Sequence, residues 1–248
     1  MSIFVAGNSH TIALALAARQ FKDATAHVKF FGFGTGHTET TSFSRLIGRN
    51  IEFTDPTYTK NLLKWTKEAS IDSTNVWALV MGTHTTRILR GPFWKNSAPP
   101  ASWKVGMRPV SSGMLRQIAK DDQKYVCTFM GQMKEIGARF LVVSCPPIRR
   151  DGELIRSGIP IDVASEVDNA SRQYFIDWLK ERRIPFVSPP PEVYDSDGLL
   201  KQQYSSSEKL SDGSLDPHHA NPAYGALMLE RVLAAISENF PDSINQGA

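Results

Sequence analysis

Two short polar stretches near opposite ends of the chain carry side chains that can act together as a nucleophile and its base. Ser9 follows an apolar run in the sequence Gly-Asn-Ser-His, and Asp216 stands three residues before His219 in Asp-Pro-His-His. This spacing allows the Asp216 carboxylate to accept a hydrogen bond from the His219 ring and to fix its tautomer. The other ring nitrogen is then free to take a proton from a serine hydroxyl, which is the chemistry of covalent acyl transfer.

The sequence around Ser9 predicts a turn between a strand and a helix. Residues 3–6 are all apolar, as in a strand buried on both faces, and residues 11–21 have the alanine-rich pattern of a helix packed on a sheet. Ser9 is therefore expected at the carboxyl end of a parallel strand and at a helix N-terminus. Open α/β sheets bind ligands at such ends, and the backbone N–H groups there attract negative charge. The alternative interpretation is that Ser9 only caps the helix.

Two further predicted strands end in loops rich in glycine and threonine. Residues 27–33 lead into Gly-Thr-Gly-His-Thr, which contains Gly36, and residues 75–81 lead into Gly-Thr-His-Thr, which contains His84. Glycine lets the backbone approach a ligand closely. Because the carboxyl ends of parallel strands share one edge of a sheet, we expect Gly36 and His84 to lie near Ser9.

The remaining predicted elements complete an alternating pattern of strands and helices. Alternation of this kind predicts one doubly wound α/β domain over residues 1–240, with a mainly parallel five-stranded sheet. Residues 241–248 are expected to form a frayed tail. The further strands are expected at residues 139–144 and 184–187, and the further helices at residues 59–69, 111–137, 162–181 and 221–236.

A segment rich in proline and aromatic residues, residues 90–109, interrupts this pattern after the third strand. An irregular stretch of this length inside a domain is uncommon and is often functional. One interpretation is a cover over the site, in which Trp94 and Trp103 contact the substrate. The other is a surface excursion that its aromatic side chains fix to the core.

Composition and spacing exclude several classes of partner. The formal net charge of +3 comes without a dense run of Lys or Arg, so no nucleic-acid partner is expected. Two cysteines, and histidines without zinc-site spacing, predict no metal. Residues 32–37 lack the final glycine of a dinucleotide-binding loop, so no cofactor is expected. The chain has neither a leader pattern nor an apolar run of about 18 residues, which predicts a cytoplasmic protein without a membrane span.

At the polar strand ends the sequence resembles the SGNH/GDSL hydrolases. Gly7–His10 is similar to the nucleophile block of that family, and Asp216–His219 to its Asp-x-x-His block. The loops with Gly36 and His84 occupy the places of the two oxyanion blocks, so the four blocks follow the order of the family. The resemblance implies a flavodoxin-like three-layer α/β/α sandwich.

The resemblance also implies a role for each matched residue. Ser9 corresponds to the nucleophile, His219 to the general base and Asp216 to its orienting partner. The backbone N–H groups of Ser9 and Gly36 correspond to oxyanion donors, with Gly34 as the second candidate for the glycine. The chain departs from the family at His84, where an asparagine donor is usual, and at Asn8, where an aspartate is usual. A neutral imidazole can still donate one N–H at position 84.

The function that follows is hydrolysis of a small acyl ester, for which the resemblance suggests an O-acetyl group on a carbohydrate. Asn8, His10, Trp94 and Trp103 are further candidates for substrate contact, and His218 is the competing candidate for the base. Two alternatives stay open: an O-acyltransferase that uses the same triad, and a non-catalytic binding module with the same fold. The sequence does not determine the oligomeric state.

Overall fold

The five predicted strands form one parallel sheet in a computed structural model, which describes residues 1–209, 213 and 216–243. The spatial order is β2-β1-β6-β9-β10, which is the flavodoxin-like order and confirms the predicted fold class. The strands are β1 (Ile3–Gly7), β2 (Val28–Gly32), β6 (Val76–Val80), β9 (Arg139–Val143) and β10 (Phe186–Val187).

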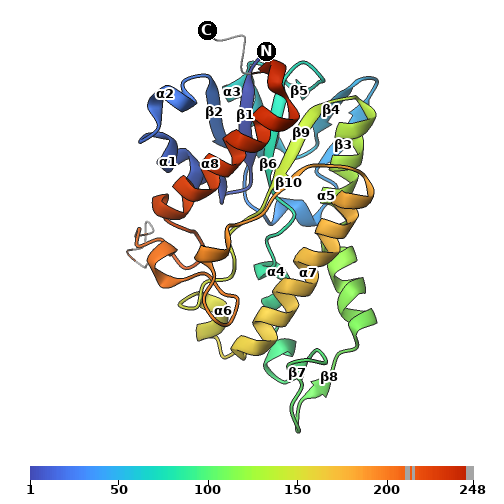
Figure 1. Ribbon diagram of the computed structural model, residues 1–248. Coiled ribbons are helices and arrows are strands. Elements are labelled where there is room, and N and C mark those ends of the chain that lie inside the picture. The colour runs from blue at the N-terminus through green and yellow to red at the C-terminus, as the bar shows by residue number, and fades with distance from the viewer. Residues whose placement is uncertain (210–212, 214–215, 244–248) are drawn as a thin grey trace.

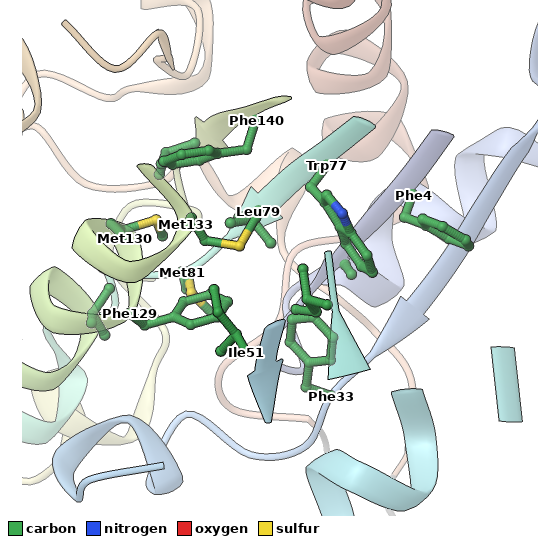
Figure 2. Packing of buried hydrophobic residues seen from close by; sticks show 14 of the residues in the cluster. Phe4, Phe33, Ile51, Trp77, Leu79, Met81, Phe129, Met130, Met133 and Phe140 are labelled. Atoms are coloured by element: carbon green, nitrogen blue, oxygen red, sulfur yellow. The ribbon is translucent and has the colours of Figure 1, made fainter. Parts of the chain in front are cut away.

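Helices cover both faces of this sheet, which makes three layers (Figure 1). On one face, α1 (Thr11–Ala18) and α8 (Pro222–Asn239) lie side by side over the strand residues that include Ile3 and Val5. The opposite face, which includes Phe4 and Trp77, packs against α3 (Pro56–Thr66), α5 (Ser112–Glu135) and α7 (Ile161–Glu181). Figure 2 shows the aromatic and methionine side chains that fill this second interface. Because both faces are covered, all residues of β1 and β6 are buried.

Side-chain caps fix where several helices begin. Asn221 accepts a hydrogen bond from the Tyr224 backbone N–H, and Ser111 accepts one from that of Met114. The helix expected at residues 59–69 instead begins at Pro56, because Asp55 caps it and proline is favoured in the first turn.

A small antiparallel sheet, with two strands before α3 and one after it, was not predicted. It consists of β3 (Ser44–Ile47), β4 (Asn50–Phe53) and β5 (Ser70–Ile71), and its apolar residues Ile51, Phe53 and Ile71 join the core under the large sheet. Gly48, with φ of +60°, makes the tight turn between β3 and β4. The glycine at position 48, between two short stretches with apolar residues, was the signal in the sequence that could have predicted this sheet.

Long α5 and α7 extend beyond the carboxyl edge of the large sheet, where a third apolar cluster lies between them and residues 88–110. In this segment Trp94 is buried, and β7 (Ser97–Ala98) pairs with β8 (Arg108–Pro109).

None of the helices in the described residues is long and apolar enough to cross a membrane. The remaining short elements are α2 (Lys22–Thr25), α4 (Thr86–Leu89), α6 (Glu153–Arg156) and the 3₁₀ turns at Thr38–Thr40, Pro92–Lys95, Pro191–Val193, Gln202–Tyr204 and Pro241–Ser243.

The expected frayed tail needs a correction at its start. Pro241–Ser243 form a 3₁₀ turn in which Ser243 is buried and donates its hydroxyl hydrogen bond to the Phe240 carbonyl. This turn continues α8 and satisfies a backbone carbonyl at its end. The rest of the predicted tail, residues 244–248, lies outside the described residues.

The contact between α1 and α8 is close enough to require a glycine. A Cβ at Gly225 would lie 2.0 Å from the carbonyl oxygen of Ala13 in α1. Gly225→Ala therefore has to push α8 off α1, and we expect the free energy of unfolding to fall by about 1–3 kcal/mol in urea titration.

Gly131→Ala in α5 is the matched control, because no atom lies within 4 Å of a Cβ there. We expect this change to raise the free energy of unfolding by up to about 1 kcal/mol, as alanine is the better helix former. Equal effects of the two substitutions would contradict the packing argument.

Candidate active site

Asp216 and His219 form a hydrogen-bonded pair in the loop before α8. Asp216 Oδ2 lies 2.8 Å from His219 Nδ1, and Oδ1 accepts the backbone N–H groups of His218 and His219. Burial alone would raise the pKa of the Asp216 carboxyl, but these backbone donors and the His219 ring hold the pKa below its ordinary value. The carboxylate is therefore ionised at neutral pH and can stabilise a protonated His219.

The second ring nitrogen of His219, Nε2, is buried and has no hydrogen-bond partner among the described residues. Next to it lies His10, whose ring centroid is 5.0 Å from that of His219 and 4.7 Å from that of His84. Burial, followed by the nearby histidines, lowers the pKa of His10 well below its ordinary value. His10 is therefore uncharged at neutral pH, and its ring contacts the imidazole rings of both His219 and His84.

Ser9 lies on the turn between β1 and α1, as predicted. A Cβ at Gly7 would lie 2.1 Å from the Val80 carbonyl oxygen, which explains the glycine that precedes this turn. The Ser9 side chain is exposed and lines a pocket of about 330 Å³ with apolar neighbours that include Ile12 and Phe31. No hydrogen bond between Ser9 and His219 occurs among the described residues.

Gly36 and His84 are in direct contact beside this turn. A Cβ at Gly36 would lie 2.8 Å from His84 Nδ1 and 3.8 Å from Asn8 Nδ2, so a larger residue there would displace the His84 ring. Among the described hydrogen bonds, the backbone N–H groups of Ser9 and Gly36 donate none. Burial, with a contribution from the Arg87 charge, lowers the pKa of His84 to about 3. His84 is thus neutral at physiological pH and can donate one N–H.

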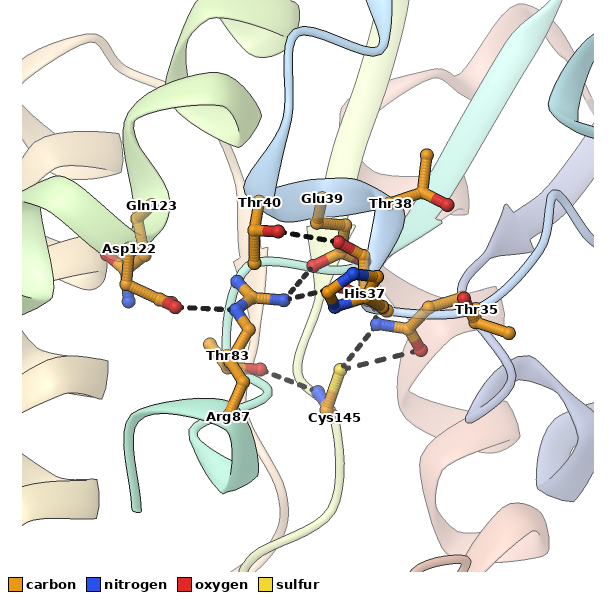
Figure 3. A network of polar contacts seen from close by, with 12 residues as sticks. Thr35, His37, Thr38, Glu39, Thr40, Thr83, Arg87, Asp122, Gln123 and Cys145 are labelled. Atoms are coloured by element: carbon orange, nitrogen blue, oxygen red, sulfur yellow. Dashed lines mark hydrogen bonds and ion pairs between the residues drawn. The ribbon is translucent and has the colours of Figure 1, made fainter. Parts of the chain in front are cut away.

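A buried ion-pair network fixes the loop that carries Gly36 (Figure 3). Arg87 Nη1 donates to the Gly36 carbonyl at 2.9 Å and to Glu39 at 3.0 Å, while Arg87 Nε donates to Asp122 at 2.6 Å. Glu39 also accepts from Asn8 Nδ2 at 2.8 Å. Complete burial raises the pKa of Glu39, and the Arg87 charge opposes that rise. Asn8 is fully buried, so its contacts are with the protein.

A second buried arginine, Arg172, joins the loops after β6 and β9 to α7. Arg172 Nε donates to Asp168 at 2.7 Å, and its Nη atoms donate to the Cys145 and Pro146 carbonyls. Asp168 in turn accepts the hydroxyl hydrogen of Thr85, the residue after His84. The position of His84 thus depends on the Arg172–Asp168 pair.

A third buried arginine, Arg149, holds the loop that carries Asp216 and His219. Its Nη1 donates to the Asp216 carbonyl at 2.6 Å and to the His219 carbonyl at 3.0 Å. Its Nε and Nη2 donate to the two carboxylate oxygens of Asp151. Arg149 therefore ties the segment after β9 to the loop before α8.

The structure does not place the two tryptophans with these residues. Trp94 is only 3% exposed, and its indole N–H donates to the Ile88 carbonyl, so it belongs to the third apolar cluster. Trp103 lies in the loop between β7 and β8, at the end of α7 away from the sheet. Burial of Trp94 favours the interpretation in which aromatic side chains fix the segment to the core, because aromatic content alone does not tell a core anchor from a pocket wall; contact of Trp103 with substrate stays a prediction. His218 lines a polar pocket with His10 and His84.

Sequence reasoning missed the three buried arginines and their carboxylates. Arg149 was visible only as one of a pair of adjacent basic residues, and nothing local marks Arg87 or Arg172 as buried. In the described part of the chain, no group of three or more His, Cys, Asp or Glu side chains has the arrangement of a metal site.

Comparisons with known proteins find similar folds among solved structures. No protein-family model and no curated protein matches the chain. Among solved structures, a GDSL-like lipase from Bacteroides thetaiotaomicron is similar with a TM-score of 0.52 and 13% identity, over 96% of this chain and 88% of that chain. A carbohydrate acetylesterase from Sinorhizobium meliloti is similar with a TM-score of 0.51 and 13% identity, over 96% and 99%. The chain therefore has the fold of the SGNH/GDSL hydrolases.

The buried pair Arg172–Asp168 gives a stability prediction. Arg172→Met leaves the carboxylate of Asp168 buried without its cation, and we expect the free energy of unfolding to fall by about 3–5 kcal/mol in urea titration. The double variant Arg172→Met/Asp168→Asn removes that charge and is expected to recover part of the loss.

Arg45→Met is the control for this prediction, because Arg45 and Glu52 form an ion pair at the surface. Its loss is expected to cost less than about 1 kcal/mol. A similar cost for the two single substitutions would mean that burial does not determine the strength of the Arg172 pair.

Proposed function

We propose that the protein is a serine ester hydrolase of SGNH type. The observation that carries this proposal is the Asp216–His219 pair: among the described residues the second ring nitrogen of His219 has no partner, and the His219 ring lies 5.0 Å from that of His10, the residue after Ser9. The backbone N–H groups of Ser9 and Gly36, which have no acceptor in the described part of the chain, support an oxyanion site at this turn.

In the proposed reaction, Ser9 Oγ attacks the ester carbonyl carbon while His219 Nε2 takes the hydroxyl proton. The negative oxygen of the tetrahedral intermediate accepts hydrogen bonds from the backbone N–H groups of Ser9 and Gly36 and from neutral His84. Collapse breaks the C–O bond, and His219 returns the proton to the leaving alcohol. Water, activated by His219, then releases the acid and free Ser9.

The contact between Ser9 and His219 forms, in this proposal, when substrate binds. Catalytic hydrogen bonds are often long or poorly aligned without substrate and tighten in the complex. The proposed substrate is a small acyl ester. An O-acetylated carbohydrate is the leading example, since one structural neighbour is a carbohydrate acetylesterase.

Ser9 is tested first with a fluorophosphonate probe. We expect the wild-type protein to be labelled on Ser9, and Ser9→Ala to lose labelling and to lower kcat for p-nitrophenyl acetate by roughly four to six orders of magnitude. Hydrolysis measured with and without a sugar acceptor separates a hydrolase from an acyltransferase. If the wild-type protein takes no label on Ser9, both the hydrolase and the acyltransferase hypotheses fail, and the non-catalytic binding module is the remaining interpretation.

The two adjacent histidines provide the control for the base. His219→Ala is expected to lower kcat by at least about 10⁴-fold, and His218→Ala by far less, because Asp216 accepts from the ring of His219. The opposite ranking would assign the base to His218.

His84 is tested by replacing it with the amide that the family usually has. His84→Asn keeps an N–H donor, so kcat is expected to stay the same or to rise. His84→Ala removes the donor and is expected to lower kcat by about 10²–10³-fold with little change in KM. Strong loss with asparagine would show that His84 does not act as an oxyanion donor.

A further inference from the structure

The loop between β7 and β8, residues 99–107, exposes apolar side chains at one end of the molecule. Val105 is 94% exposed at its tip and Trp103 is 46% exposed beside it, whereas most large apolar side chains of the described residues are buried. Phe93, before β7, and Met114, after β8, are also exposed. Figure 1 shows this loop projecting beyond the ends of α5 and α7.

Hydrogen bonds hold the loop in this shape. The Trp103 indole N–H donates to the Met107 carbonyl at 2.9 Å, and the Met107 backbone N–H donates to the Lys104 carbonyl at 3.0 Å. At the base of the loop, the backbone N–H groups of Ala101 and Ser102 donate to Glu166 on α7. The apolar tip is therefore preformed, and binding through it costs little ordering of the chain.

The chain segment that carries the tip has charge of one sign, and the acidic side chains near the loop, Asp162 and Glu166, come from α7 and contact Lys104 and the base of the loop. Residues 73–120 contain no Asp or Glu, and their basic side chains include Lys95 and Arg108, which are exposed on either side of the loop. Within the described part of the chain neither forms an ion pair, while Lys104 pairs with Asp162. The apolar tip is thus flanked by two uncompensated positive charges.

We propose that this loop attaches the protein to the surface of an anionic membrane. The exposed apolar groups form a projection, which can enter the headgroup region of a bilayer, and tryptophan prefers that region. Lys95 and Arg108 then face the negatively charged lipid headgroups. Charge complementarity to a flat surface, together with the projecting shape of the loop, favours a membrane as the partner.

Sedimentation with lipid vesicles tests this proposal on the full chain. We expect binding to vesicles of phosphatidylcholine mixed with phosphatidylglycerol, weaker binding at high salt, and much weaker binding to phosphatidylcholine alone. Absence of binding to the anionic vesicles, or equal binding to both kinds, would overturn the proposal.

Variants separate the charged and apolar contributions. Lys95→Gln/Arg108→Gln is expected to weaken binding to anionic vesicles about 25-fold, since each basic side chain near such a surface contributes about fivefold. Val105→Ser removes the most exposed apolar side chain without touching the core, and is expected to weaken binding and to reduce the shift of tryptophan emission on vesicle addition.

Trp65→Ser on α3 is the matched control, because Trp65 is similarly exposed, at 41%, but lies outside the loop. Its binding is expected to equal that of the wild type, with folding of each variant checked by circular dichroism. If the loop variants bind vesicles as the wild type does, or if the loop instead binds an acidic protein and no vesicle, the proposal fails.

Discussion

Three buried arginines hold the carboxyl edge of the sheet together. Loops from several strand ends meet there, and their backbone carbonyls need donors that water cannot supply. Arg87, Arg149 and Arg172 each donate to such carbonyls and each pair with a carboxylate. A guanidinium suits this role because its five N–H groups lie in one rigid plane. The site geometry depends on these pairs, since removing one partner leaves a buried charge.

The same constraint separates the roles of the clustered histidines. His10 and His84 are buried near one another, and this burial lowers the pKa of both rings; the Arg87 charge lowers that of His84 further, and the Arg172 charge disfavours both protonated forms. His219 differs because the Asp216 carboxylate accepts from its ring. Of the three rings of His10, His84 and His219, only that of His219 has a carboxylate partner among the described residues, and such a partner can stabilise the imidazolium that acid–base catalysis requires. The cluster therefore combines one candidate base with neutral neighbours that can donate hydrogen bonds to a substrate.

The two ends of the long helices α5 and α7 pack in different apolar clusters. One end of α5 and α7 packs under the aromatic core of the sheet, whereas the other end supports the third apolar cluster with Trp94. The third apolar cluster supports the base of residues 99–107, which project from it as an ordered loop. The proline-rich segment, which has little regular structure, is thus fixed by its buried aromatic residue and by Glu166.

Local patterns in the sequence determined the parallel strands, the helix caps at Ser111 and Asn221, and the Asp216–His219 hydrogen bond. These features depend on residues within a few positions of one another, where chain geometry leaves few choices. Arg87 pairs with Glu39 across 48 positions, and Arg149 bonds to the Asp216 carbonyl across 67. Only the tertiary structure decided these contacts, the burial of Trp94 and the placement of His10 against His219, because packing between distant elements, and not local periodicity, sets where such side chains point.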